Sequence, residues 1–203
     1  MIVLGLTGSV AMGKSTVTSM FAELGAATSN SDEIVHRLLE SDQEVLVQIK
    51  RHFPAVMENG VVDRKKLGDR VFNNPRELKL LEDILHPRVQ KVTKAFIQLT
   101  KEQGKWLVVL DIPLLYETGA EKNCNYVVVV TASAEIQRER VMARPGMTEE
   151  KFRHILAQQM PDAEKRQRAN FIVSTDQNIE TTFRHVQAIV DGLKKREELL
   201  LKE

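Results

Sequence analysis

Residues 2–16 read IVLGLTGSVAMGKST, an apolar run that leads directly into a glycine-rich segment and a lysine. The run at 2–6 is almost continuously apolar, as in a strand of a parallel sheet that is covered on both faces. Residues 8–15 fit the P-loop pattern G-x-x-x-x-G-K-[ST] in the strand-to-helix position that the motif requires. These residues predict an α/β fold that binds the phosphates of a nucleotide.

The P-loop pattern predicts a role for each of its residues. The loop bends so that successive backbone N–H groups point at a phosphate, and the following helix adds its positive N-terminal end. Lys14 would reach the β- and γ-phosphates, and the Ser15 hydroxyl would complete the coordination of Mg²⁺. The alternative is a glycine-rich turn with an exposed lysine, and the flanking pattern argues against it. The predicted nucleotide contacts are Gly8, Ala11, Met12, Gly13, Lys14, Ser15 and Thr16.

Strand and helix patterns alternate along the rest of the chain. Apolar runs that predict further buried strands lie at 106–110, 126–130 and 171–173. Helical patterns cover 76–85, 89–99, 135–142 and 179–201. This alternation predicts an α/β protein with a doubly wound parallel sheet and crossover helices, in a single domain of residues 1–203.

Two segments are predicted to form structures outside the sheet and its crossover helices. Residues 33–103, approximately, are nearly all helix-like and long for one crossover, so we expect an inserted helical substrate subdomain there. A turn is predicted at 60–63, and Pro87 is predicted to bend or separate two helices. Residues 135–168, approximately, are rich in Arg and Gln and are interrupted by a Pro-Gly pair, which predicts a polar lid.

Composition excludes several classes of protein. Lys and Arg number 29 against 28 Asp and Glu, and this balance lacks the basic excess of a nucleic-acid-binding protein. No apolar run approaches the ~20 residues of a membrane helix. Cys124 is the single cysteine, and without a signal-like N-terminus it predicts a cytoplasmic location. The five histidines and Cys124 show no metal-ligand spacing, so the only metal expected is nucleotide-bound Mg²⁺.

The P-loop alone does not distinguish a GTPase or a motor ATPase from a small-molecule kinase. The chain contains no Asn-Lys-x-Asp stretch for guanine, and Asp111 is followed by Ile112-Pro113 where a GTPase would have a glycine switch. We therefore predict a kinase that transfers the γ-phosphoryl group of ATP to a small-molecule hydroxyl.

The motifs resemble those of the dephospho-coenzyme A kinase family over nearly the whole chain. The matching residues are 5–8 with the P-loop, Asp63-Arg64, Leu81-Glu82, His86-Pro87, Val89, the IPLLYE stretch at 112–117, Gln137, Arg140, Arg144, Gln159, Lys165 and Ala169. The resemblance implies ATP-dependent phosphorylation of the ribose 3′-hydroxyl of dephospho-CoA, the last step of coenzyme A synthesis. We also expect a monomer or weak homo-oligomer, and the charge balance and the lengths of the apolar runs predict no nucleic-acid or membrane partner.

Three positions depart from the family pattern. Asn30-Ser31-Asp32 replaces the usual Asp-Ala-Asp and keeps only the second carboxylate. Ala11 replaces a common glycine and is acceptable only with a negative φ. Asn170 and Thr175 stand where an Asp and an Asn usually shape the loop on the adenine side.

The resemblance also implies roles outside the P-loop. Asp32 is the predicted general base and contacts the acceptor substrate; the alternative is a helix N-cap, since Asn30 to Asp32 all have cap-forming side chains. Arg140 is predicted to bind the nucleotide and neutralise charge on the transferring phosphoryl group, with a solvated helix face as the alternative. Leu114, after Pro113, is predicted to face the substrate crevice.

Two nearby residues are not assigned to the site. His86 is more often structural than functional in such a setting, and the role of Arg138 stays open. Two other functions remain as alternatives: another nucleoside monophosphate or small-molecule kinase, and a nucleotide-binding protein that has lost transferase activity.

Overall fold

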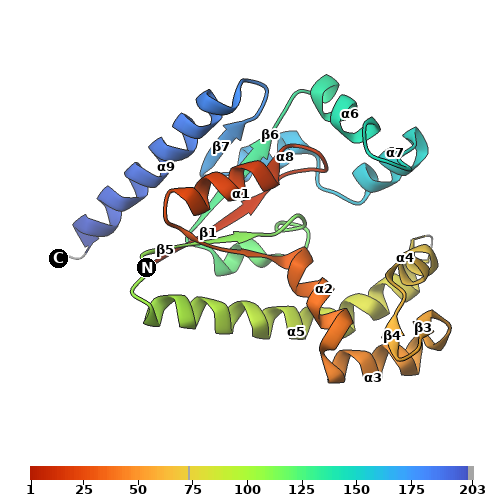
Figure 1. The fold of residues 1–203 in the computed structure, drawn as a ribbon. Coiled ribbons are helices and arrows are strands. Elements are labelled where there is room, and N and C mark those ends of the chain that lie inside the picture. Colours follow the sequence, from red (N-terminus) through yellow and green to blue (C-terminus); the bar gives the residue numbers. More distant parts are fainter. Residues whose placement is uncertain (73, 201–203) are drawn as a thin grey trace. The chain divides into compact units, whose positions relative to one another are not determined.

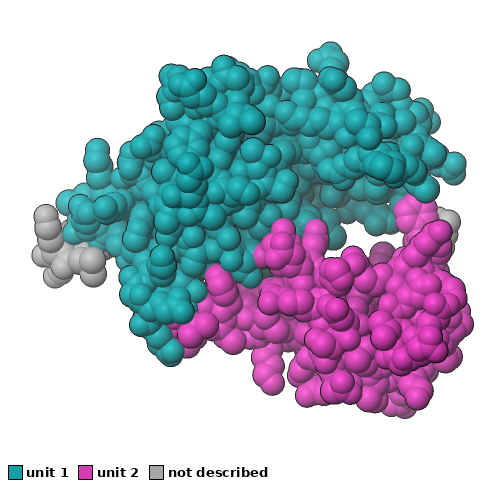
Figure 2. Space-filling view, in the orientation of Figure 1, with its two compact units in different colours: residues 1–29, 100–203 teal, residues 30–99 magenta. Residues whose placement is uncertain are grey.

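The chain divides into two compact units, which Figure 2 colours separately. Unit 1 comprises Met1–Ser29 and Thr100–Glu203, and unit 2 comprises Asn30–Leu99. The computed structural model describes residues 1–72 and 74–200. Residue 73, the predicted helix end at 201, and residues 202–203 of the predicted single domain lie outside the described residues.

Unit 1 is built on a five-stranded parallel sheet with the strand order β2-β5-β1-β6-β7 (Figure 1). The strands are β1 (Ile2–Thr7), β2 (Ala27–Asn30, whose last residue opens unit 2), β5 (Leu107–Asp111), β6 (Tyr126–Thr131) and β7 (Phe171–Ser174). β1 pairs in parallel with β5 and β6, and β6 pairs in parallel with β7. The α/β sheet predicted from sequence is confirmed, and its central strand leads into the P-loop.

Apolar side chains cover both faces of this sheet. On one face, alternate residues of the strands pack against α1 (Lys14–Glu23) and α9 (Ile179–Leu200), which lie side by side in Figure 1. On the other face, Val127 and Val129 of β6 pack with Leu115 and Tyr116. Burial on both faces explains why these strands read as continuous apolar runs in the sequence.

Three further helices of unit 1 follow β6. They are α6 (Ala134–Met142), α7 (Glu149–Ala157) and α8 (Asp162–Arg168). Side chains define where two of them begin: the Ser133 hydroxyl accepts from the N–H of Ile136, and the Thr148 hydroxyl accepts from the N–H of Lys151. The helix predicted at 135–142 is present, whereas the role of this segment as a lid stays a prediction.

Unit 2 has its own apolar core. It consists of α2 (Ser31–Ser41), α3 (Gln43–His52), η1 (Pro54–Val56), β3 (Met57–Glu58), β4 (Val61–Val62), α4 (Arg64–Val71) and the part of α5 (Pro75–Glu102) up to Leu99. Twelve buried apolar residues from these elements pack together, among them Ile34, Phe53 and Leu85. A separate core of this kind allows unit 2 to keep its structure as one body.

Two details of unit 2 differ from the sequence-based expectation. The predicted turn at 60–63 belongs to a short hairpin, in which Asn59 (φ 51°) and Gly60 (φ 84°) connect β3 and β4. Pro87 does not separate two helices, because α5 continues through it. Apolar residues on both sides of Pro87, including Leu85 and Val89, pack on the same core, and this packing offsets the missing hydrogen bond. Within the described residues, no helix has both the length and the apolar character needed to span a bilayer.

Candidate active site

The P-loop connects Thr7 at the end of β1 to Lys14 at the start of α1. Glycine is required at two of its positions. A Cβ on Gly8 would stand 2.5 Å from the carbonyl oxygen of Val130, and Gly13, the N-cap of α1, has a φ of 84°. The two glycines of the motif therefore allow the loop to turn closely against β6 and enter α1.

Ala11 adopts a left-handed conformation with a φ of 60°. The negative φ that would make an alanine acceptable here is therefore not adopted in this structure. A residue with a Cβ loses roughly 1–2 kcal/mol in this conformation, so the loop is held in a strained form by its surroundings. Met12, the next residue, is buried, and its sulfur accepts a hydrogen bond of 3.0 Å from the N–H of Ala132.

Lys14 forms an ion pair with Asp111, the last residue of β5. Asp111 is fully buried, and its other carboxylate oxygen accepts a hydrogen bond of 2.9 Å from the Thr18 hydroxyl. The parallel register places Asp111 opposite Leu6, which explains why it lies beside the P-loop. Sequence reasoning did not select Asp111, although a carboxylate that ends an apolar strand was a usable signal.

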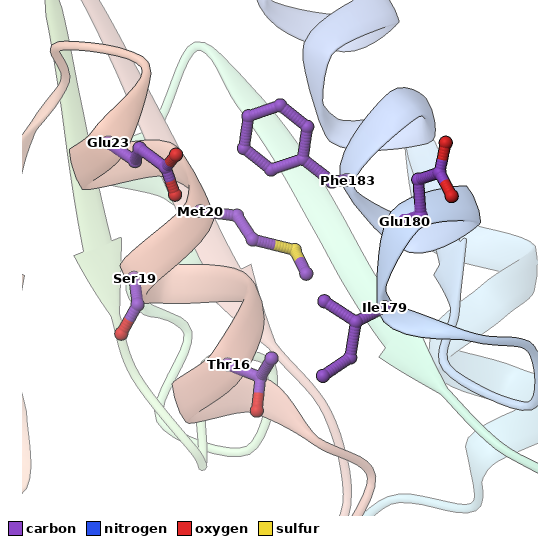
Figure 3. A pocket seen from close by; sticks show the side chains of 7 residues that line it. All are labelled: Thr16, Ser19, Met20, Glu23, Ile179, Glu180 and Phe183. Atoms are coloured by element: carbon purple, nitrogen blue, oxygen red, sulfur yellow. The ribbon is translucent and has the colours of Figure 1, made fainter.

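Ser15 and Thr16 lie exposed in the first turn of α1. From Thr16 a cavity of about 590 Å³ extends between α1 and α9, and Figure 3 shows Met20 of α1 pointing toward Ile179 and Phe183 of α9. The remaining lining residues are Ser19, Met20, Glu23, Ile179, Glu180 and Phe183. Met20, Ile179 and Phe183 are its apolar lining residues, and Glu23 and Glu180 contribute two carboxylates.

Arg140 of α6 is docked on the residue that follows β7. Its two terminal nitrogens donate to the hydroxyl and to the carbonyl oxygen of Thr175, both at 2.8 Å. The same hydroxyl donates to the carbonyl oxygen of Met12 at 3.0 Å, so Thr175 connects Arg140 to the P-loop. Arg138, two residues earlier on α6, pairs instead with Glu149 on an exposed surface.

Hydrogen bonds connect the segment after β5 to the end of β1 and to α8. The carbonyl oxygen of Pro113 accepts from the Thr7 hydroxyl at 3.0 Å and from Lys165 at 3.2 Å. Lys165 is fully buried and forms an ion pair of 2.9 Å with Glu117. Leu114 is only half-buried in this segment, whereas Leu115 is in the core.

Tyr116 follows these residues, and burial, together with the nearby charge of Glu121, raises the pKa of its hydroxyl. The group therefore stays protonated at neutral pH.

Comparison with known proteins gives the family. The family model described as dephospho-CoA kinase matches residues 2–181. The chain belongs to the dephospho-CoA kinase family. A dephospho-CoA kinase of Mesorhizobium japonicum is 52% identical over 96% of this chain and 98% of the relative.

Two solved structures are also similar. A crystal structure from Thermus thermophilus is 33% identical with a TM-score of 0.81, over 95% of this chain and 97% of the other. A dephospho-CoA kinase from Campylobacter jejuni is 27% identical with a TM-score of 0.72, over 96% and 98%.

Asn170 and Thr175, two of the residues that depart from the dephospho-CoA kinase pattern, flank the two ends of β7. Asn170 pairs with Val127 near the amino end of β6, accepting from its N–H at 2.8 Å and donating to its carbonyl oxygen at 3.0 Å. The P-loop lies at the carboxyl end, so the expected place of Asn170 in an adenine-side loop is wrong. Thr175 follows the carboxyl end of β7 and lies beside Gly13.

Asn30, which also departs from the family pattern, determines where α2 begins. The Asn30 side chain is the N-cap and accepts hydrogen bonds from the N–H groups of Asp32 and Glu33, at 2.8 and 3.2 Å. Asp32 is the second residue of the helix, so the alternative that Asp32 is the cap is wrong. Its role as the general base stays a prediction. His86 lies exposed on α5.

Among the described residues, no group of three or more His, Cys, Asp or Glu side chains could hold a metal ion. The groups that fit Mg²⁺ are the oxygens of Ser15 and Asp111, since this ion prefers carboxylate and hydroxyl ligands together with nucleotide phosphates. Asp111 in the present structure is bonded to Lys14.

Proposed function

We propose that this chain transfers the γ-phosphoryl group of ATP to the ribose 3′-hydroxyl of dephospho-CoA. The observation that supports the chemistry is the position of Lys14. This residue lies at the start of the helix that follows the P-loop, and the buried carboxylate of Asp111 holds it there by an ion pair. Membership of the dephospho-CoA kinase family over residues 2–181 carries the choice of acceptor. As a member of this family the chain is a transferase that uses ATP as its co-substrate.

Lys14 and Asp111 exchange partners when the nucleotide binds. In the ion pair, each group neutralises the other while Asp111 is out of contact with water. The β- and γ-phosphates would take the Lys14 ammonium group, and the released carboxylate would join the Ser15 hydroxyl as a ligand of Mg²⁺. When bound, Mg²⁺ would neutralise part of the phosphate charge. This exchange would keep Asp111 paired at every stage.

Arg140 and Asp32 would complete the transfer. The Arg140 guanidinium would neutralise charge that develops on the transferring phosphoryl group, since its hydrogen bonds to Thr175 already direct it toward the P-loop side of α6. Asp32 would accept the proton of the acceptor hydroxyl, and its place two residues after the carboxyl end of β2 supports this role. Leu114, half-buried after Pro113, would contact the substrate.

The experiment that tests this proposal is a single-turnover assay with ATP, Mg²⁺ and dephospho-CoA, in which ADP and CoA are separated by chromatography. Stoichiometric CoA is expected. Adenosine, shikimate and AMP serve as competing acceptors, and preferential transfer to any of them would establish a different small-molecule kinase. Absence of transfer despite ATP binding would establish a nucleotide-binding protein without transferase activity.

Lys14→Ala tests the chemistry in a multiple-turnover version of this assay, which gives kcat. The variant should lose at least about 10²-fold in kcat, because one positioned charge on the transferring group typically contributes that much or more. Lys105→Ala, which changes an exposed lysine of unit 1, is the matched control and should behave as the wild type. A folded Lys14→Ala protein with wild-type kcat would contradict the nucleotide site.

A further inference from the structure

Two glutamine side chains bind the backbone of one P-loop residue, Val10. Nε2 of Gln137 donates to the carbonyl oxygen of Val10 at 2.8 Å, and Oε1 of Gln159 accepts from its N–H at 3.0 Å. Gln137 is on α6 and is 7% exposed, whereas Gln159 lies between α7 and α8. A side chain from the first helix of the predicted lid and one from the connection between its second and third helices therefore meet at a single residue of the P-loop.

The chemistry of the backbone determines the direction of both hydrogen bonds. A carbonyl oxygen can only accept, and an amide N–H can only donate. Gln137 must therefore present its NH₂ group to Val10, and Gln159 must present its oxygen. The two glutamines are not equivalent, and an isosteric glutamate could replace the second but not the first.

The residue that follows Val10 is the strained Ala11, with a φ of 60°. A residue with a Cβ leaves this conformation unless its neighbours hold it there, whereas glycine adopts it at little cost. The two side-chain hydrogen bonds restrain the peptide groups on either side of Val10, and the second of these groups leads into Ala11. They are therefore placed to oppose relaxation of the loop.

We propose that Gln137 and Gln159 are positioning residues that hold Val10, and with it the strained P-loop, in the conformation that receives the nucleotide phosphates. The inference rests on the proposed function only in requiring that the P-loop binds a nucleotide, and it is independent of the acceptor. It also sets the limits of the lid. Because Gln137 and Gln159 are both bonded to Val10, lid motion is expected in the residues between these two glutamines.

The test measures the Kd of ADP with Mg²⁺ by calorimetry on the full chain, so that no turnover is needed. Gln137→Glu removes the donor and sets a carboxylate against the carbonyl oxygen of Val10, and it should weaken ADP binding about tenfold or more. Gln159→Glu adds the same charge but keeps the acceptor, and it should stay within about threefold of the wild type.

Apolar replacements of the same length test each bond without the added charge. Gln137→Met and Gln159→Met should both weaken ADP binding and raise the KM for ATP while the KM for dephospho-CoA is unchanged. Gln48→Met, on the exposed surface of α3, is the matched control for the substitution. Thermal midpoints of all variants show whether each is folded, and the methionine pair serves if Gln137→Glu does not fold.

The strained residue supplies a second, independent readout. Ala11→Gly removes the cost of the left-handed conformation, so it should restore at least about threefold of the affinity lost in Gln137→Met. Wild-type affinity in both methionine variants, or equal losses in Gln137→Glu and Gln159→Glu without rescue by Ala11→Gly, would overturn the positioning role. Failure of the wild-type protein to bind ADP would instead overturn the nucleotide site and the inference with it.

Discussion

Thr175 is the residue through which Arg140 and the P-loop share a hydrogen-bond network. Its hydroxyl accepts from Arg140 and donates to Met12, and it is 8% exposed. Hydrogen bonds to charged groups contribute about 1.5–3 kcal/mol. We therefore predict that Thr175→Val, which keeps the shape and removes the hydroxyl, lowers kcat about tenfold, whereas Thr175→Ser retains most of the activity.

Thr182→Val provides the control for this prediction. Thr182 is also buried, and its hydroxyl donates to backbone carbonyl oxygens of Ser174 and Asn178 without reaching Arg140. Its replacement should lower the thermal midpoint and leave kcat unchanged. Equal kcat values for Thr175→Val and Thr182→Val would show that Thr175 only supports the fold.

Asp32→Asn tests the proposed general base. The capping side chain belongs to Asn30, so this change leaves the N-cap of α2 in place and removes a carboxylate whose interaction with the helix dipole contributes about 0.3–1 kcal/mol. Loss of a positioned base should lower kcat by ~10²- to 10⁴-fold while ADP binding persists. Glu33→Gln removes a carboxylate from the same helical turn and is the matched control. A loss of kcat below about fivefold in Asp32→Asn, or the same loss in both variants, would rule out a base at this position.

The sequence predicts those site residues whose role follows from local backbone geometry. The P-loop pattern requires a fixed spacing along one strand-loop-helix unit, and the structure has this unit at residues 2–23. Asp111 and Thr175 lie beside the loop only because β5 and β7 are in the same parallel sheet as β1. Sheet order and register depend on contacts between distant segments, and no local pattern reports them. The left-handed Ala11 has the same origin, because its restraints come from residues 137 and 159.

At the scale of elements, the segment from α6 to α8 contains buried residues at both of its end helices and exposed residues between them. Gln137 and Val141 of α6 are buried, and Lys165 of α8 is fully buried, whereas most residues of 143–151 are exposed. Local opening requires little energy where few apolar contacts must break. The mobile part of the predicted lid should therefore be 143–157 and not the whole of 135–168.

Limited proteolysis tests this boundary. Trypsin can cleave after Lys151 and Arg153, which are both exposed, whereas Pro145 blocks cleavage after Arg144. A non-hydrolysable ATP analogue with Mg²⁺ should slow cleavage at these two sites about tenfold or more, because a closed lid must open before the protease can bind it. Cleavage at the exposed Lys194 and Lys195 of α9 is the internal reference and should not change. Equal rates with and without the analogue would contradict a lid in this segment.

Element boundaries in unit 2 show where local propensity is overridden. A proline inside a helical pattern predicts a break, yet α5 runs from Pro75 to Glu102 because its apolar face on both sides of Pro87 is buried in one core. The hairpin of β3 and β4 is the opposite case, because it is present although the sequence did not predict its strands. Its strands are two residues each, too short to show an alternating pattern, so the sequence predicted only a turn, at 60–63.

At the scale of the whole molecule, the two units have separate apolar cores. The core of unit 1 lies on the two faces of the sheet, and that of unit 2 lies among its helices. A ligand that contacts one unit stabilises the structure that forms its site. Ligands can therefore report which unit binds them, and this separation allows the predicted substrate role of unit 2 to be tested apart from nucleotide binding.

Hydrogen exchange, measured with ADP and Mg²⁺ alone and then with added dephospho-CoA, tests whether unit 2 binds the substrate. ADP with Mg²⁺ alone should protect amides of the P-loop and α1, because the phosphates bind there. Addition of dephospho-CoA should then protect amides of α2 and α4 in unit 2, if these helices hold the acceptor. A ligand present at 100 times its Kd stabilises the bound form by about 2.7 kcal/mol, so openings that release it should slow by up to about 100-fold. Free pantetheine, which lacks the nucleotide part of the acceptor, is the control and should give weaker protection. Protection confined to unit 1 with both ligands present would show that residues 30–99 do not bind the substrate, and the acceptor site would then have to be sought around Leu114.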